Sequence, residues 1–209
     1  MRVVARPDLP EALRSGPYVG GIGAGGFEVR ADGKFHRCHI WNEWRHEKEL
    51  EAKFVHIDTK GNKRILRLGD VVRASGVTTG VDRMEMRGEF PKVFVSYPEA
   101  GVSVEYTSFF LPGDVKNSSL PAVLVRVRGT GRLMFLIENR FDCVPKPSGD
   151  NRMFLESQEG ALGLHVRKGK ASFLPRWAEY LAIQTFGGWD WWGRPEPKMG
   201  QNMGRIVWE

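Results

Sequence analysis

The stretch Gly101–Phe110, GVSVEYTSFF, alternates apolar and polar residues at nearly every second position. Val102, Val104 and Tyr106 fall on one face of an extended chain, while the residues between them are polar. This alternation is typical of a strand with one face in a core and one in water. The stretch therefore predicts a half-buried β-strand.

The same alternation recurs along most of the chain. It is found in the segments KVFVSY, PAVLVRVRG, RLMFLIEN, ALGLHV and AEYLAIQTF. Turn residues separate these segments at roughly 8 to 12 residue intervals, which favours an antiparallel sandwich. Only two short helices are expected, in DLPEALRS (8–15) and in part of NEWRHEKELEAK (42–53). We therefore predict a mostly β fold, an antiparallel two-sheet β-sandwich with few short helices.

The composition of the 209 residues is that of an ordinary globular protein, with 41% hydrophobic and 27% charged residues. The net charge of +6 comes from basic residues that are scattered rather than interleaved with aromatics, so nucleic acid is not an expected partner. Cys38 and Cys143 lack CxxC spacing, which disfavours a disulfide framework or cysteine-bound zinc. We expect no membrane span and a cytoplasmic location. The scarcity of Gln and Asn suggests a thermophilic source.

Gly21, Gly23 and Gly26 have the spacing G-x-G-x-x-G, which in a dinucleotide-binding domain precedes a helix. Here an alternating segment and the turn Asp32-Gly33 follow instead, which predicts a β-hairpin. We therefore expect no nucleotide and no other cofactor. Two interpretations of the loop Gly20–Gly26 stay open: an irregular loop with positive φ angles, or a backbone that approaches another domain or a sugar.

His36, His39 and His46, with Glu43 and Glu47, are the densest candidate metal ligands. The first two histidines are three residues apart, which on a strand points their side chains to opposite faces. The third lies beside the two glutamates on one predicted helical turn, an ordinary surface arrangement. We therefore expect no metal site.

Two blocks of the sequence, in this order, resemble glycoside hydrolase family 116, the family of non-lysosomal glucosylceramidase and of archaeal and bacterial β-glucosidases. They are GGIGAGGFEVRADGKFHRCHIWN (20–42) and YPEAGVSVEYTSFFLPGDVKNSSLPAVLVRVRGTG (97–131). The resemblance covers residues 18–130 well. It implies a supersandwich-like N-terminal domain, which we place at 18–209 after a lead-in segment at 1–17. In this family the catalytic residues lie in a later (α/α) barrel of helices.

The resemblance implies that the catalytic nucleophile and acid/base have no matching positions in this sequence. We therefore expect no catalytic residue here, and a chain that is a fragment, a truncated form or the product of a split gene. A retaining glycosidase needs two carboxylates that flank the bond. The acidic residues considered for that role are Glu43, Glu47, Asp114, Glu138, Asp142 and Asp190. Asp114 is expected to cap a turn, and the polar cluster around Glu138 to form a salt-bridged strand end.

Two groups of residues are candidates for contact with the missing domain or with sugar. The first is the glycine loop and the end of the first block, namely Gly21, Gly23, Gly25, Gly26, Trp41 and Asn42. The second is the aromatic group Trp189, Trp191 and Trp192, whose indoles suit either packing or stacking on a pyranose ring.

Two hypotheses about function follow from these observations. In the first, the chain is the non-catalytic sandwich domain of a β-glycosidase, with a helical catalytic domain as its partner and a β-glycoside or glycolipid nearby. In the second, it is an independent carbohydrate-binding module with the Trp-rich segment as its platform. A sandwich face that lacks its helical partner would be apolar, so self-association is a further expectation.

Overall fold

The computed structural model describes residues 2–5, 15–30, 34–39, 48–50, 52–73, 76–138, 144–148, 151–156, 158, 160–168, 171–173 and 203–208. The chain divides into two compact units. Unit 1 comprises Met1–Leu50, Leu66–Asp70 and Gly80–Thr130, and unit 2 comprises Glu51–Ile65, Val71–Thr79 and Gly131–Glu209.

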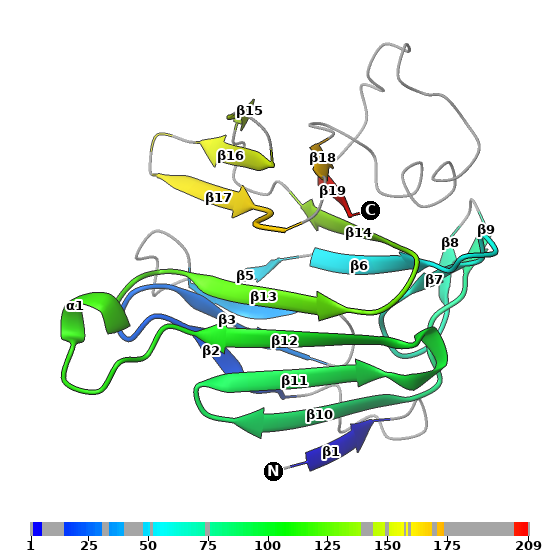
Figure 1. Ribbon diagram of the computed structural model, residues 1–209, viewed down its shortest axis with the longest axis horizontal. Coiled ribbons are helices and arrows are strands. Elements are labelled where there is room, and N and C mark those ends of the chain that lie inside the picture. The colour runs from blue at the N-terminus through cyan, green and yellow to red at the C-terminus, as the bar shows by residue number, and fades with distance from the viewer. Residues whose placement is uncertain are drawn as a thin grey trace. The chain divides into compact units, whose positions relative to one another are not determined.

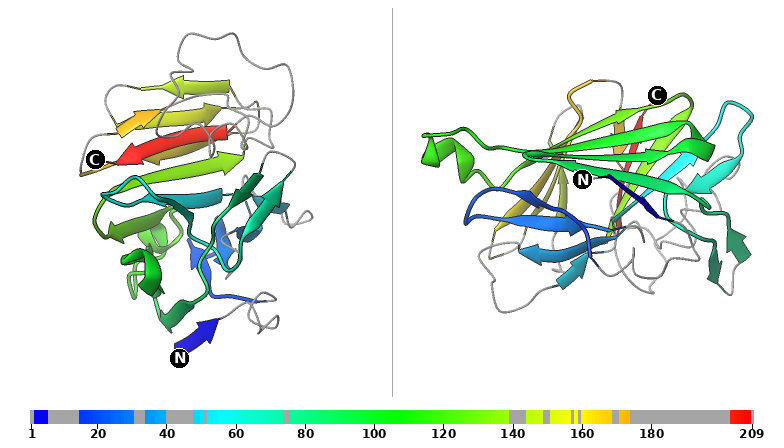
Figure 2. Two further views of the ribbon diagram at one scale, coloured as in Figure 1. Left: turned by 90° about the vertical axis from the view of Figure 1, so that its right-hand side faces the viewer. Right: turned by 90° about the horizontal axis from the view of Figure 1, so that it is seen from below.

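Unit 1 contains two antiparallel sheets. The first has the order β1 (Arg2–Ala5), β10 (Met84–Glu89), β11 (Lys92–Tyr97), β12 (Val102–Ser108) and β13 (Val123–Arg128). Its strands β10 to β13 form a meander of consecutive neighbours (Figure 1). The second sheet has the order β2 (Tyr18–Gly20), β3 (Gly26–Val29), β4 (Phe35–His39) and β5 (Lys48–Leu50). The two sheets lie in separate layers, the first green and the second blue (Figure 2, right).

Aromatic rings join the two sheets of unit 1. Phe27 and Phe35 of the second sheet stack with ring centroids 3.9 Å apart. Each of them meets the edge of Tyr106, on β12 of the first sheet, at 6.2 Å. The first sheet contributes eight buried side chains to this core: Met84, Met86, Val93, Val95, Tyr97, Val102, Val104 and Tyr106. Unit 1 is therefore a β-sandwich, and the alternation predicted for GVSVEYTSFF is confirmed.

Short irregular elements connect the strands of the first sheet. A 3₁₀ helix, η2 (Pro98–Ala100), joins β11 to β12 and ends at Gly101, whose φ of 61° is left-handed. One turn of helix, α1 (Val115–Ser118), lies in the connection from β12 to β13, beyond the end of β12 (Figure 1).

Unit 2 is also built of antiparallel strands. Its largest sheet has the order β18 (Ala171–Phe173), β19 (Met203–Trp208), β14 (Arg132–Glu138), β6 (Ala52–Ile57) and β7 (Lys63–Ile65). A second sheet contains β15 (Val144–Pro147), β16 (Arg152–Glu156) and β17 (Ala161–His165). A two-stranded ribbon is formed by β8 (Val71–Arg73) and β9 (Gly76–Thr78).

The predicted mostly β fold with antiparallel sheets and few short helices is confirmed. The helix expected within 42–53 is wrong where the structure describes it, because Lys48–Leu50 and the start of Ala52–Ile57 are strands. Pairing of Leu50 with Phe35 and of Lys48 with Cys38 overrides the helical propensity of this charged segment. The helix expected at 8–15 and the strand expected in AEYLAIQTF lie outside the described residues. The domain bounds 1–17 and 18–209 stay a prediction.

Candidate functional site

The loop between β2 and β3 is tied by hydrogen bonds to the connection that follows β12. The backbone N–H of Gly20 donates to Ser108 Oγ at 3.0 Å, and that of Ile22 donates to the carbonyl oxygen of Ser118 at 2.8 Å. Within the loop, the N–H of Gly21 donates to the carbonyl oxygen of Gly25 at 2.9 Å. Two connections that are about ninety residues apart in the sequence are thus fixed to one another.

The glycines of this loop are needed because other backbone atoms approach them closely. A Cβ atom on Gly21 would lie 2.3 Å from the carbonyl oxygen of Leu120. A Cβ on Gly25 would lie 2.9 Å from the carbonyl oxygen of His39. Gly23 has open space around it but a left-handed φ of 64°. The positive φ expected for this loop is present at Gly23, and the close approach seen here is to other segments of the same chain. Approach of the loop to another domain or to a sugar stays a prediction.

The connection 109–122 is itself ordered by side-chain hydrogen bonds. Ser118 is buried, and its Oγ accepts from the N–H of Leu111 at 2.9 Å and donates to the carbonyl oxygen of Leu111 at 3.0 Å. Asp114 caps α1 by accepting from the N–H of Asn117 at 3.0 Å, and it also accepts from the side-chain amide of Asn117. These two hydrogen bonds lower the pKa of Asp114. The capping role predicted for Asp114 is confirmed.

Seven large apolar side chains among the described residues are exposed, and all of them belong to this part of unit 1. We call them the apolar end: Tyr18, Ile22, Phe90, Phe109, Leu111, Val115 and Leu120. Val115 is 80% exposed and Phe90 is 75% exposed. The turn that carries Phe90 lies beside the end of β12, because the carbonyl oxygen of Pro91 accepts from the N–H of Ser108 at 2.9 Å. Such a concentration of exposed apolar groups marks an interaction surface.

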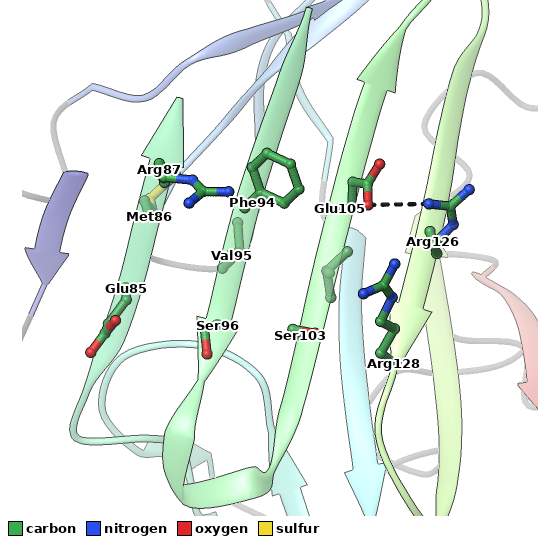
Figure 3. A pocket seen from close by; sticks show the side chains of 11 residues that line it. Glu85, Met86, Arg87, Phe94, Val95, Ser96, Ser103, Glu105, Arg126 and Arg128 are labelled. Atoms are coloured by element: carbon green, nitrogen blue, oxygen red, sulfur yellow. Dashed lines mark hydrogen bonds and ion pairs between the residues drawn. The ribbon is translucent and has the colours of Figure 1, made fainter. Parts of the chain in front are cut away.

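A hollow of about 270 Å³ lies on the outward face of β10 to β13, and we call it the Phe94 hollow. Pairing between the strands arranges its side chains in two rows. One row runs Glu85, Ser96, Ser103, Arg128, and the other runs Arg87, Phe94, Glu105, Arg126 (Figure 3). The small side chains of Ser96 and Ser103 are neighbours in the middle of the first row, so the hollow opens above them.

Charged groups of both signs surround the Phe94 hollow. Arg87 lies over the Phe94 ring, with its Cζ atom 4.6 Å from the ring centroid. Glu105 forms ion pairs with Lys92 at 3.1 Å and with Arg126 at 3.4 Å (Figure 3). Burial raises the pKa of Glu105, but Lys92, Arg126 and a hydrogen bond from Thr107 lower it more, so the net shift is downward. The carboxylate is therefore ionised at neutral pH.

A second ionised carboxylate lies in the other sheet of unit 1. Glu28 is 3% exposed, and it forms an ion pair with Arg30 at 3.0 Å and a longer one with Arg37 at 3.7 Å. The N–H of Gly16 also donates to Glu28 Oε1. Burial raises the pKa of Glu28, whereas these hydrogen bonds and the two guanidinium charges lower it, with a net downward shift. The role of this carboxylate is to neutralise two arginines, Arg30 directly after β3 and Arg37 on β4.

The structure places only some of the residues selected from the sequence. Gly21, Gly23, Gly25 and Gly26 lie in the loop that contacts 108–121. Trp41, Asn42, Trp189, Trp191 and Trp192 lie outside the described residues, as do Glu43, His46, Glu47, Asp142 and Asp190. Glu138 ends β14. Among the described residues there is no group of three or more His, Cys, Asp or Glu side chains that is suited to a metal ion.

Sequence reasoning missed the apolar end and the Phe94 hollow. The signal for the apolar end was the run Phe109–Leu111 directly before a Pro-Gly-Asp turn, where apolar side chains are not needed for a strand. The signal for the hollow was Phe94 itself, an aromatic residue on the otherwise polar face of KVFVSY. No helix among the described residues has the length and apolar character needed to cross a membrane.

The fold and the connections of unit 1 define an antiparallel β-sandwich domain with exposed apolar side chains at one end. A family model described as beta-glucosidase 2, glycosyl-hydrolase family 116 N-term, matches residues 16–130, more than half of the chain. The chain therefore belongs to the family of N-terminal domains of glycoside hydrolase family 116, as the resemblance indicated. An N-terminal domain of this kind implies a catalytic domain as its partner. No curated protein matches the chain.

Proposed function

We propose that the chain is the non-catalytic N-terminal β-sandwich domain of a β-glucosidase or glucosylceramidase-like enzyme, and that its apolar end docks onto a helical (α/α) barrel catalytic domain. The observation that carries this proposal is the apolar end itself. Six of its seven exposed apolar side chains come from three connections of unit 1, and Tyr18 begins β2. Family membership supplies the partner that would cover them.

The geometry of the connections supports docking because it holds the apolar side chains in place before a partner arrives. The N–H of Ile22 donates to the carbonyl oxygen of Ser118. Both backbone polar groups of Leu111, its N–H and its carbonyl oxygen, hydrogen-bond to Ser118 Oγ. A surface that is already ordered loses less conformational entropy on binding. Apolar groups on such a surface therefore contribute more of their burial energy to affinity.

The acidic residues described in unit 1 support a non-catalytic role. Glu28 and Glu105 are each held in ion pairs, and Asp114 caps a helix. A retaining glycosidase needs one carboxyl group with a raised pKa as proton donor, beside an ionised nucleophile. The pKa values of Glu28, Glu105 and Asp114 are all lowered, which does not suit a proton donor.

The docking surface is tested with the helical catalytic domain encoded in the same genome. We expect the full chain to form a 1:1 complex with that domain, as measured by size-exclusion chromatography with light scattering. The double variant Phe90→Ser and Val115→Ser should weaken the complex by at least about tenfold, since it removes the two most exposed apolar side chains. The matched control is Lys116→Ser, an exposed position next to Val115.

A complex that forms with unchanged affinity in the double variant would contradict docking through the apolar end. The non-catalytic assignment has its own test, in which the isolated chain is incubated with an aryl β-glucoside. We expect no hydrolysis above the uncatalysed rate, and sustained turnover by the purified chain would refute the assignment.

Several finer expectations stay predictions. They are contact of the glycine loop with the partner domain or a sugar, a β-glycoside or glycolipid as the substrate of the whole enzyme, self-association, the cytoplasmic location and the thermophilic source. The second function, a carbohydrate-binding module with Trp189, Trp191 and Trp192 as its platform, rests on residues outside the described part of the chain.

A further inference from the structure

We propose that the Phe94 hollow binds one pyranose unit of a neutral oligosaccharide. The inference does not rest on docking through the apolar end, because the two surfaces share no residue. It also differs from a platform of Trp side chains, since the hollow contains none.

The shape of the hollow suits a single sugar ring. Adjacent strands are about 4.8 Å apart, so Glu85 on β10 and Arg128 on β13 are separated by about 14 Å of sheet. Between them lie only the short side chains of Ser96 and Ser103. The resulting space of about 270 Å³ lies above the two serines, with longer polar side chains at both ends of the row.

The polar groups around the hollow match the hydroxyl groups of a sugar, which both donate and accept hydrogen bonds. The Glu85 carboxylate, which already accepts from Arg83 at 2.6 Å, can only accept hydrogen bonds. The Arg128 guanidinium can only donate, and the two serine hydroxyls can do either. Among the described residues, no hydrogen bond or ion pair engages the Arg128 side chain, which points over the sheet toward β12 (Figure 3). Its donors are therefore available to a ligand, and hydrogen bonds from a charged donor are the stronger ones.

Phe94 adds an apolar wall beside the serines. Arg87 covers one side of its ring at 4.6 Å, which leaves the rest of the ring for the C–H groups of a pyranose. The polar-and-aromatic combination is typical of small-molecule sites, where a few polar groups orient a ligand against an apolar surface.

The balance of charge favours a neutral ligand. Glu85 and Glu105 line the hollow together with Arg87, Arg126 and Arg128, and most of these charges are already paired. Glu85 pairs with Arg83, Glu105 with Arg126 and Lys92, and Arg87 with Glu89. Because paired charges largely cancel, the lining offers neither the cluster of available cations that a phosphate or a uronic acid needs nor the available carboxylates that a cation needs. A nucleic-acid backbone, which needs an excess of unpaired basic groups, is disfavoured for the same reason.

The test titrates the full, ¹⁵N-labelled chain with cellotetraose, laminaritetraose and xylotetraose. We expect at least one of these neutral oligosaccharides to bind, with the largest amide shifts at Ser96, Ser103 and their strand neighbours. Phe94→Ala and Arg128→Ala should each weaken binding by about tenfold. Phe94→Tyr, which keeps the ring, should bind as the parent does, and so should Arg152→Ala, a change at an exposed arginine on β16.

Three results would overturn the proposal. One is the absence of binding by all three neutral oligosaccharides. Another is binding that shifts amides outside β10 to β13 and is unchanged in Phe94→Ala and Arg128→Ala. The third is tighter binding of tetragalacturonate than of any neutral probe, which would assign the hollow to an anionic sugar. Because all variants change exposed or half-exposed side chains, an unchanged thermal midpoint verifies that each is folded.

Discussion

At the scale of single residues, the glycine loop is determined by what its missing side chains allow. Gly21 lies where a Cβ atom would be 2.3 Å from the carbonyl oxygen of Leu120, and that oxygen belongs to backbone that cannot rotate away. The spacing G-x-G-x-x-G therefore serves contact between two connections of one sandwich. The strand β3 follows the glycines, as the predicted hairpin requires, where a dinucleotide-binding turn would be followed by a helix.

Gly21→Ala should lower the free energy of unfolding by about 2 kcal/mol, since the new methyl group forces the loop away from Leu120. Urea denaturation of the parent and the variant measures the difference. The control is Gly88→Ala on β10, where a Cβ atom meets nothing within 4 Å and φ is not left-handed. Equal stability losses in the two variants would show that the close approach to Leu120 is not what restricts Gly21.

Glu28 makes stability depend on pH. Its pKa in the folded protein is below 4.5, because the hydrogen bonds and charges of Arg30, Gly16 and Arg37 outweigh the effect of burial. The ionised carboxylate therefore stabilises the fold above pH 4.5, and this contribution is lost as the pH falls through the folded pKa. Glu28→Gln should be less stable than the parent by about 2 kcal/mol at pH 7.

The difference between the parent and Glu28→Gln should shrink as the pH is lowered below 4.5, which thermal unfolding across a pH series measures. Glu89→Gln is the control, because Glu89 is exposed and its ion pair with Arg87 is in water. A difference that stays constant from pH 7 to pH 3 would mean that Glu28 acts through packing and not through its charge.

At the scale of elements, the connection between β12 and β13 behaves as a small ordered unit centred on Ser118. Its hydroxyl closes the segment 111–118 onto Leu111, and its carbonyl oxygen accepts from the N–H of Ile22 in the loop between β2 and β3. Asp114 begins the single helical turn that presents Ser118. One buried serine thus contacts two loops that carry members of the apolar end, one through its side chain and one through its backbone.

Ser118→Ala should loosen both loops without unfolding the sandwich, because the N–H and carbonyl groups of Leu111 lose their partner. Amide hydrogen exchange should accelerate by about tenfold at Leu111 and Ile22 and stay unchanged in β11 and β12. Ser119→Ala is the matched control, since its hydroxyl donates only to the nearby carbonyl oxygen of Lys116. Unchanged exchange at Ile22 would show that the Ser118 hydroxyl does not stabilise the loop that carries Ile22.

The elements also show what the sequence could predict. Alternation identified β11 and β12 because each of these strands has one buried face, as at Val93 and Val95 of β11. The helix expected in part of 42–53 does not extend over Lys48–Leu50, whose residues favour a helix locally but form a strand by pairing with β4. Residues 42–47 lie outside the described residues. The Phe94 hollow was beyond prediction for a related reason. Its rows depend on the register between four strands, which local pattern does not specify.

At the scale of the whole molecule, the range matched by the family model cuts through a pair of hydrogen-bonded strands, β6 and β14. The match ends at residue 130, just before β14. Within unit 2, β14 pairs with β6 along Leu133 to Ile137, and the Phe54 and Phe135 rings contact each other with centroids 4.8 Å apart. The strand β6 lies inside the matched range but depends on a neighbour beyond it.

A chain cut after residue 130 should therefore expose the buried residues Phe54 and Val55 of β6 and one unpaired strand edge. We expect the form 1–130 to bind more of the dye ANS and to unfold at a lower temperature than the full chain. The form 1–138, which restores β14, should recover part of the difference, because the β6–β14 register then reforms. Equal dye binding and equal midpoints for 1–130 and the full chain would mean that β6 is held by unit 1 residues instead of by β14.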